Sequence, residues 1–407
     1  MKVYIGIDWS EEKHDVVFLS EAGAKMAYLC IPHSLEGFRQ FHAERAKMGL
    51  KLEECVIGIE TSHSLLVDYL LEQGYPSLYV LPPSQVHANQ GRFRQSGAKD
   101  DASDARLIGE ILRTDQRGLH PWRPDKVMTR QMRTQVRFIL ELQHQITRLS
   151  NQLRAVLLRY YPVALEVFKT GLGSQVALEF IIAYPTLPEA QALSLQEFSD
   201  FAKQHRYPHP KDLPACYHRL QASPLPASRD VEDIYYLQAQ QLAQLLHATL
   251  RLRLDNLAQL HQRYLQHPCH DIFASLPACG DLIGPALLAF FGDDRQRFPN
   301  AATAQAMAGT CPVTKRSGKF RSVCFRFACD QDWRYICHEW AHLLIQQENP
   351  IALAYYHNVR SHAHSQAHAE RCLANRWIAI VWKLWVSGKA YDPAIHLQQR
   401  ATRSKPR

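Results

Sequence analysis

Aspartates gather in the stretch AKDDASDARLI at residues 98–108, where Asp100, Asp101 and Asp104 fall within five positions. A helix that begins here accommodates one or two carboxylates, because the dipole and the free N–H groups of its first turn favour negative charge. Asp101 and Asp104 stand three residues apart and therefore share one helix face. Two carboxylates held side by side repel each other, so this spacing predicts that a positive charge binds between them.

Two further acids follow short apolar segments that are typical of buried strands. Asp8 ends the segment KVYIGID, and Glu60 ends CVIGIE. Chemistry collects at strand ends in open α/β sheets, so we expect these two acids to converge with the helical pair. Mg²⁺ or Mn²⁺, hard cations that prefer oxygen ligands, would offset the repulsion among four carboxylates. Two such ions can stabilise the attacking and the leaving oxygen of a phosphodiester exchange.

The elements that must position these acids follow an α/β pattern. Three strands come first, then helix, strand, helix, strand and a final helix that starts at the aspartates. This order predicts an α/β layer fold of the ribonuclease-H type. The expected strands are 2–8, 15–20, 24–32, 55–60 and 76–83, and the expected helices between them are 34–48 and 62–74.

The pattern changes to all-α after Pro124. Seven residues recur at steps of three and four and predict a coiled-coil seam: Ile139, Leu142, Ile146, Leu149, Leu153, Val156 and Tyr160. A second long helix is expected at 229–265, which could fold back on the first or pair with another subunit. The predicted domains are 1–123 (α/β), 124–267 (a coiled-coil arm with an insertion at about 167–226), 268–395 (mainly helical) and 396–407 (a basic tail).

Charge is distributed unevenly along the 407 residues, which hold 47 Lys and Arg against 39 Asp and Glu. Residues 113–160 contain ten Lys or Arg and three acids, and the tail adds four basic residues and no acid. Clustered positive charge indicates a polyanionic partner, most simply nucleic acid. The alternative is a solvated helix face with a solubilising tail.

Neither a membrane span nor a secretory signal is expected. No apolar run approaches the roughly 18 residues of a membrane span, and the N-terminus enters a strand pattern directly. We therefore expect a cytoplasmic protein. The ten cysteines lack the spacing of a disulfide framework and indicate reduced core residues. Metal binding is the weaker alternative for the tightest group, which is Cys324, Cys329, Cys337, His338 and His342.

Taken in order, the acidic motifs carry more information than each one alone. G-I-D after a strand also opens sugar-kinase and actin-like ATPases, but those continue with Gly and Thr, whereas Trp9 and Ser10 follow here. G-I-D, then G-I-E, then K-x-D-x-x-D-A-R resembles the DEDD transposases of insertion sequences, a group that includes the Piv-type DNA invertases. The resemblance implies an N-terminal domain like the Holliday-junction resolvase RuvC. It also implies a metal site formed by Asp8, Glu60, Asp101 and Asp104.

A second set of motifs lies near the C-terminus. LPACGDLIGPALLAFFGD has the pattern of a helix-hairpin-helix, in which Ala278, Gly280 and Gly284 let two helices and a DNA backbone approach closely. The stretch that follows resembles the serine-containing transposase domain of the same family, which makes Ser317 the catalytic serine. Here CFRFACDQDW follows the serine, where the family has a turn with Lys and Gly. Phosphate contacts are expected from Lys315, Arg316, Lys319 and Arg321.

The resemblance covers roughly residues 1–165 and 268–390. It implies a prokaryotic recombinase, acting at the nucleoid, that cuts and rejoins element ends and target DNA. Ser317 would attack a phosphodiester, assisted by metal-bound acids. The resemblance further implies homo-oligomers and a non-coding bridge RNA that selects the DNA. Two alternatives remain: a metal-dependent, structure-specific endonuclease without a covalent step, and a non-catalytic nucleic-acid-binding protein.

Overall fold

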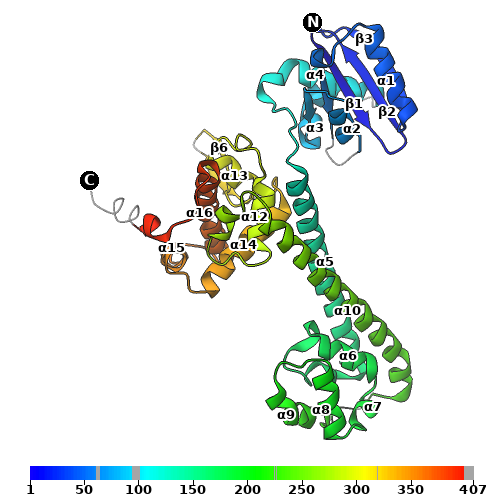
Figure 1. Ribbon diagram of the computed structural model, residues 1–407, viewed down its shortest axis with the longest axis vertical. Helices are drawn as coiled ribbons and strands as arrows, with labels where there is room; N and C mark the ends of the chain where they lie inside the picture. The colour runs from blue at the N-terminus through cyan, green and yellow to red at the C-terminus, as the bar shows by residue number, and fades with distance from the viewer. Residues whose placement is uncertain (61–64, 94–100, 224, 226, 319, 398–407) are drawn as a thin grey trace. The chain divides into compact units, whose positions relative to one another are not determined.

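The computed structural model describes residues 1–60, 65–93, 101–223, 225, 227–318 and 320–397 (Figure 1). The chain divides into two compact units, Met1–Pro124 and Asp125–Arg407. The first unit is mixed α/β and the second is mostly helical, as the sequence predicts. The finer division into four domains stays a prediction.

A five-stranded sheet in the order β3-β2-β1-β4-β5 forms the centre of the first unit. The first three strands are antiparallel neighbours, whereas β4 and β5 run parallel to β1. This confirms the predicted sequence of strands. Their bounds are β1 Val3–Trp9, β2 Lys13–Leu19, β3 Lys25–Pro32, β4 Cys55–Ile59 and β5 Leu78–Val80.

Helices cover both faces of this sheet because apolar side chains point to both sides of its central strands. Val3, Ile5 and Ile7 of β1 pack with residues of α1 (Leu35–Lys47) and α2 (Leu65–Glu72). The opposite face, which includes Tyr4, packs against α3 (Pro83–Phe93) and α4 (Asp101–Asp115). The unit therefore has three layers, with α4 next to the central strand β1.

Helix α3 was not expected from the sequence. Its segment PSQVHANQGRF is largely polar, and Val86 is its member of the buried cluster beneath α4. Pro83 at the first position suits a helix start, because proline has no N–H to leave unbonded there. Short polar helices of this kind lack the apolar period that identifies longer ones.

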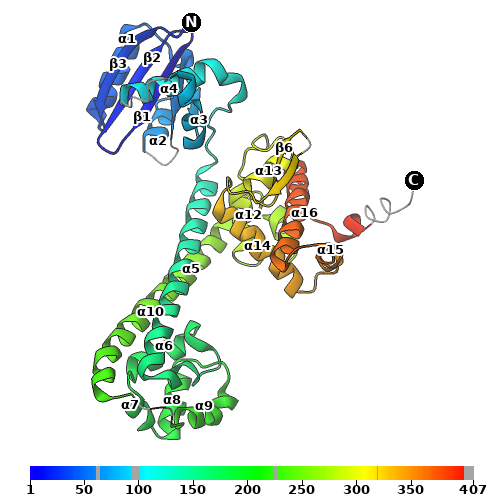
Figure 2. The ribbon, with the colours of Figure 1, turned by 180° about the vertical axis from the view of Figure 1, so that it is seen from behind.

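Helices α5 (Val127–Tyr160) and α10 (Arg229–Leu265) run side by side in the second unit, as both views show (Figures 1 and 2). The bounds of α10 match the predicted helix at 229–265. Six of the seven predicted seam positions on α5 are buried, and Leu149 is partly buried against the same cluster as its neighbours. The two helices therefore pack within one chain; a coiled-coil geometry stays a prediction.

The central insertion is a folded helical module with its own core. Phe180 and Phe198 are fully buried in it, and Tyr161 at the end of α5 packs in the same cluster as Ala239 and Ala243 of α10. Small residues on α10 let the module approach the helix closely. The module contains α6 (Gln175–Ala183), α7 (Leu187–Gln191), α8 (Leu195–Gln204) and α9 (Leu213–Leu220).

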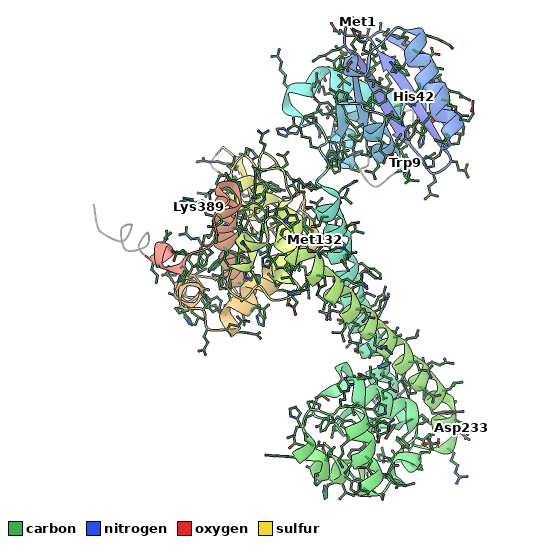
Figure 3. The ribbon with its side chains drawn as sticks, viewed as in Figure 1. Met1, Trp9, His42, Met132, Asp233 and Lys389 are labelled. Carbon is green, nitrogen blue, oxygen red and sulfur yellow. The ribbon has the colours of Figure 1, made fainter. Side chains whose placement is uncertain are left out.

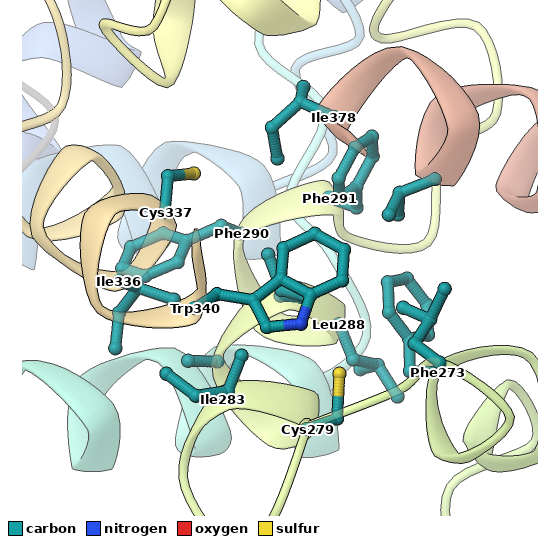
Figure 4. Packing of buried hydrophobic residues seen from close by; sticks show 14 of the residues in the cluster. Phe273, Cys279, Ile283, Leu288, Phe290, Phe291, Ile336, Cys337, Trp340 and Ile378 are labelled. Carbon is teal, nitrogen blue, oxygen red and sulfur yellow. The ribbon is translucent and has the colours of Figure 1, made fainter. Parts of the chain in front are cut away.

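The C-terminal part of the second unit is built around four buried tryptophans, Trp333, Trp340, Trp377 and Trp385. Figure 4 shows Trp340 among Ile283, Phe290 and other apolar side chains of this cluster. Its elements are α11 (His270–Ala274), α12 (Ile283–Phe291), α13 (Ala301–Met307), β6 (Val313–Ser317), β7 (Phe320–Cys324), α14 (Gln331–Gln346), α15 (Pro350–Arg360) and α16 (Gln366–Ser387). Among the described residues, no helix is long and apolar enough to cross a membrane.

Candidate active site

Two acids lie at the carboxyl ends of neighbouring parallel strands. β1 and β4 pair with Gly6 opposite Gly58 and Ile7 opposite Ile59. Asp8 and Glu60 are the next residues on the two strands, and both are half-buried. Side chains alternate along a strand, so Asp8 points to the face of Gly6. Asp8 and Glu60 therefore lie side by side at one edge of the sheet, as the sequence predicts.

Helix α4 brings its first turn to the same edge. A Cβ added to Gly6 would lie 1.9 Å from the carbonyl oxygen of Ala105 and 2.5 Å from the amide nitrogen of Gly109, so strand and helix backbones touch there. At the other end of the strand, Tyr4 Oη donates a hydrogen bond to Gln116 Oε1 at 3.5 Å. α4 therefore runs antiparallel to β1 and starts where β1 ends.

The start of α4 contributes Asp101 and Asp104. Asp104 is half-buried, whereas the side chain of Asp101 lies outside the described residues. The dipole of the helix N-terminus also favours negative charge at this edge. Three described carboxylates, Asp8, Glu60 and Asp104, thus belong to elements that meet at one edge of the sheet.

A further carboxylate, Asp15, escaped the sequence analysis. It lies directly opposite Asp8 in the antiparallel pair of β1 and β2, which places both side chains on the face covered by α4. Asp15 is buried, ion-paired with Lys13 Nζ at 3.6 Å and hydrogen-bonded by the hydroxyl of Tyr28. That hydrogen bond raises the pKa of Tyr28 to about 12. The short WSEEKH turn, which sets the register, is the signal that could have identified Asp15.

Ser317 lies at the end of an exposed two-stranded hairpin in the second unit. It ends β6 and pairs with Phe320, the first residue of β7. The hairpin was not predicted, and its turn includes Gly318 with φ of 56°. Ser317 is exposed, so its hydroxyl is accessible to a molecule that binds at the hairpin.

Basic side chains surround this serine. Lys315, Arg316 and Arg321 are exposed, and Arg316 lies directly opposite Arg321 across the hairpin. Like charges in directly opposed positions destabilise a hairpin unless an anion neutralises them. Lys319, the fourth predicted contact, lies outside the described residues. The hairpin is therefore suited to bind phosphate beside a hydroxyl.

Comparisons with known proteins match both parts of the chain. A family model described as "Transposase", of the DEDD type of IS110, matches residues 5–162. A second, described as "Transposase IS116/IS110/IS902 family", matches residues 270–357, which include Ser317. The "Mini-circle putative transposase for IS117" of Streptomyces coelicolor is 30% identical over 388 residues, which cover 93% of this chain and 92% of that protein. The chain belongs to the IS110 family of transposases.

Other relatives agree with this assignment. The "Putative transposase y4uE" of Sinorhizobium fredii is 29% identical over 215 residues. This match covers 52% of this chain and 59% of that protein. The "Insertion element IS900 uncharacterized 42 kDa protein" of Mycobacterium paratuberculosis is 25% identical over 81% of this chain and 82% of its own. Asp8, Glu60 and Asp104 lie in the first matched segment of this IS110-family chain, and the Ser317 hairpin lies in the second.

One glycine of the predicted helix-hairpin-helix, Gly284, is needed for packing inside the protein. All nine residues of α12 are buried, and a Cβ on Gly284 would lie 2.8 Å from Tyr264 Oη. The small size of Gly284 therefore lets α12 approach α10 inside the protein. Gly280 differs, because it is exposed and has a φ of 37°.

The described acids of the transposase have the chemistry of a divalent-metal site. Carboxylate oxygens are the ligands that Mg²⁺ and Mn²⁺ prefer. No group of three His, Cys, Asp or Glu side chains close enough to hold a metal ion occurs among the described residues, which exclude the side chain of Asp101. All ten cysteines are free, including Cys324, Cys329 and Cys337 of the group considered for metal binding. Of the neighbouring histidines, His342 lies 3.4 Å from Glu370.

Proposed function

We propose that this IS110-family transposase cuts and rejoins insertion-sequence ends and target DNA through a serine nucleophile and an acidic metal site. Ser317 Oγ attacks phosphorus, and the bond from phosphorus to the leaving strand breaks as the new ester forms. The hydroxyl proton leaves Ser317, and the leaving oxygen gains one. The phosphoserine ester conserves the bond energy, so the reverse step can join a different strand without an external energy source.

Asp8, Glu60, Asp101 and Asp104 would hold the divalent ion. Bound there, Mg²⁺ supplies a Lewis acid that stabilises the charge developing on the phosphate oxygens. Each carboxylate would offer oxygen ligands to the ion, and the ion would in turn attract the phosphate. Lys315, Arg316, Lys319 and Arg321 would hold the DNA backbone near Ser317, with Gly280 offering a second close approach.

One observation above all supports the proposal: the register of β1 on β4 leaves Asp8 and Glu60 adjacent at the edge where α4 begins. Adjacent acids that no catalytic role required would repel each other and destabilise the sheet edge. The strand order β3-β2-β1-β4-β5, with an antiparallel first half, also supports a ribonuclease-H-like, RuvC-like assignment for this unit.

The proposal includes a guide RNA and a homo-oligomer. Base pairing with a non-coding RNA would supply the sequence specificity, while the protein holds backbones through charge. Exchange of strands at two DNA sites requires more than one nucleophile, which an assembly of several copies provides. The long helices α5 and α10 would contribute to that assembly.

The decisive experiment replaces the serine. Ser317→Ala should abolish recombination between element-end and target DNA. It should also prevent the covalent protein–DNA adduct that we expect from the unaltered protein on denaturing gels, because no other group in the proposal forms the ester. Ser322→Ala is the matched control, since Ser322 lies on the other strand of the same hairpin. We expect Ser322→Ala to keep both activities within about twofold, as a surface substitution of small effect.

Other outcomes would favour the alternatives. Full recombination by Ser317→Ala would show a metal-dependent nuclease mechanism without a covalent step. Full function of both Asp8→Ala and Asp104→Ala would show that the acids are not catalytic and leave a nucleic-acid-binding protein. Loss of the adduct with Ser322→Ala as well would indicate that the hairpin, and not the hydroxyl, was disturbed.

A further inference from the structure

The segment that carries Ser317 combines positive charge with aromatic side chains. Residues 313–327, VTKRSGKFRSVCFRF, contain five Lys or Arg, three Phe and no acid. The cations were assigned to phosphate binding, but the three phenylalanines have no role in that chemistry. We name Phe320, Phe325 and Phe327 the aromatic platform.

Two rings of the aromatic platform are strongly exposed. Phe327 is 78% exposed and Phe320 is 65% exposed, although both are large and apolar. Phe320 pairs with Ser317 across the hairpin, so one ring stands beside the proposed nucleophile. Phe320 shares the face of Ser317, whereas the exposed residues Arg321 and Val323 lie on the opposite face of β7. Phe325 is also exposed and follows the last residue of the strand. Exposed apolar side chains that lie next to one another often mark a binding site, whereas isolated ones are common on any protein surface.

The third ring, Phe325, contacts Phe327 and two arginine side chains. Phe325 meets Phe327 edge-on, with ring centroids 5.1 Å apart. The guanidinium groups of Arg334 on α14 and Arg371 on α16 lie 5.0 and 5.3 Å from the centroid of Phe325. Cations over an aromatic face attract its π electrons and restrict its motion. Phe327 is therefore held in place with its ring toward solvent.

Hydrogen bonds from two arginine side chains to backbone carbonyl oxygens hold the same segment in place. Arg326 Nε donates to the carbonyl oxygen of Cys311 at 3.2 Å, and Arg334 Nη1 donates to the carbonyl oxygen of Arg326 at 3.3 Å. An ordered segment loses little conformational entropy when it binds, which favours affinity. The exposed rings are thus preorganised for a flat ligand.

Two acids that lie close in sequence to Arg334 and Arg371, Asp330 and Glu370, are already paired. Asp330 accepts from the amide of Trp333 at 3.0 Å and from Arg137 at 2.8 Å. Glu370 contacts His342 at 3.4 Å and accepts from Gln366 at 2.8 Å. The surface around the aromatic rings is therefore positively charged, which complements a polyanion and disfavours a basic partner.

We propose that the aromatic platform binds unpaired DNA nucleotides next to the phosphate that Ser317 attacks. One base stacks on Phe320, on the face of the hairpin that holds Ser317, another stacks on Phe327, and phosphates bind Arg316 and Arg321 on the opposite face. This inference rests on the proposed function. It adds that the DNA strands are unpaired at the cleavage site when the protein binds them. Single-stranded nucleic acid is recognised by this combination of cations and exposed rings, because every unpaired base offers a π face. Bases in a duplex stack on their neighbours and offer no such face.

The test measures binding of the full-length protein to a fluorescein-labelled oligo(dT) strand by anisotropy, without divalent metal. Phe327→Ala should weaken binding about five- to a hundredfold, because stacking contributes on that scale per base. Phe327→Trp should restore it, since a larger ring stacks at least as well. Phe138→Ala removes another exposed ring, 43% exposed on α5, and should leave binding unchanged.

A labelled duplex of mixed sequence completes the experiment. Its affinity should not change with Phe327→Ala, because phosphate contacts remain. Equal loss for single strand and duplex, or no loss for either, would overturn the proposal. A change in self-association by light scattering with unchanged oligo(dT) affinity would overturn it in favour of a protein-docking surface. No cleavage is involved, so failure of Ser317 as a nucleophile would leave this result unaffected.

Discussion

Carboxylates at the edge of the sheet repel one another, and the fold offsets part of that repulsion locally. Lys13 and Tyr28 neutralise and hydrogen-bond Asp15, the acid nearest to Asp8 in the register. The N-terminal dipole of α4 supports Asp104. A divalent ion bound by these carboxylates would offset their repulsion further, so metal affinity is a direct measure of the proposed site.

Asp104→Asn should weaken Mn²⁺ binding about tenfold or more, because it removes one ligand charge and keeps the side-chain shape. Isothermal titration calorimetry of the full-length protein measures this without any reaction. Asp115→Asn is the matched control: Asp115 ends the same helix and pairs with Arg92 at 2.9 Å. Equal affinity of Asp104→Asn and the unaltered protein would exclude Asp104 as a ligand.

Sequence identified the acids by type and spacing but could not identify their neighbours. Asp8 and Glu60 end apolar strands, a pattern visible in one dimension. Asp15 begins no motif, and its position beside Asp8 depends on a turn that fixes the register. The sequence around Asp15 shows no pattern that identifies it. Its position next to Asp8 becomes visible only when the pairing register of β1 and β2 is known.

Between elements, the contact of β1 with α4 positions the acids. Gly6 and Gly58 are opposite each other in the sheet, and both meet α4: Gly6 at its backbone and Gly58 at the side chains of Ile108 and Leu112. No larger residue fits at Gly6. Two glycines opposite each other thus bring the start of the helix to the ends of the strands.

Gly6→Ala should push α4 away from β1 and destabilise the first unit by about 3 kcal/mol or more, because its Cβ would overlap backbone atoms that cannot move aside. Hydrogen exchange read by mass spectrometry should show faster exchange in peptides from β1 and α4. Gly91→Ala is the control, since no atom lies within 4 Å of its added Cβ in α3. Equal protection in both variants would contradict the close approach.

Long helices and buried strands were predicted well, even where the apolar spacing is less regular, as in α10, and short polar elements were not. α10 and the strands of the sheet were placed within a few residues. Helix α3 and the β6–β7 hairpin were missed because their side chains are mostly polar or exposed. Exposed strands carry no buried face, so the alternation that identifies a strand is absent from β6.

On the scale of the whole molecule, the charge count of the sequence overstates the surface available to nucleic acid. Arg133 is paired with Asp125 and donates to the carbonyl oxygen of Ala289, and Arg137 pairs with Asp330. These arginines join α5 to the C-terminal elements of the same unit. Arg148 and Arg154, farther along α5, are exposed. A linear sequence does not distinguish the two groups, because Ala289 and Asp330, which bind Arg133 and Arg137, lie more than a hundred residues away from them.

The exposed arginines of α5 give the proposed RNA partner a quantitative test. RNA should copurify with the protein, and the double variant Arg148→Ala, Arg154→Ala should weaken its binding regardless of RNA sequence. The slope of log affinity against log salt should fall by about 1.4, since each lost phosphate contact on a single strand contributes about 0.7. Filter binding over a salt series measures the slope.

Lys169→Ala, Lys203→Ala is the matched control, because Asp212 and Asp200 already neutralise these two lysines at 2.8 and 3.3 Å. The control should keep the slope of the unaltered protein, since ion-paired lysines release few counterions when RNA binds. An equal change in both double variants would show that net charge, and not the α5 surface, governs binding. Absence of copurifying RNA at low salt would remove the guide from the proposed function and leave the DNA chemistry to stand on Ser317 and the acids.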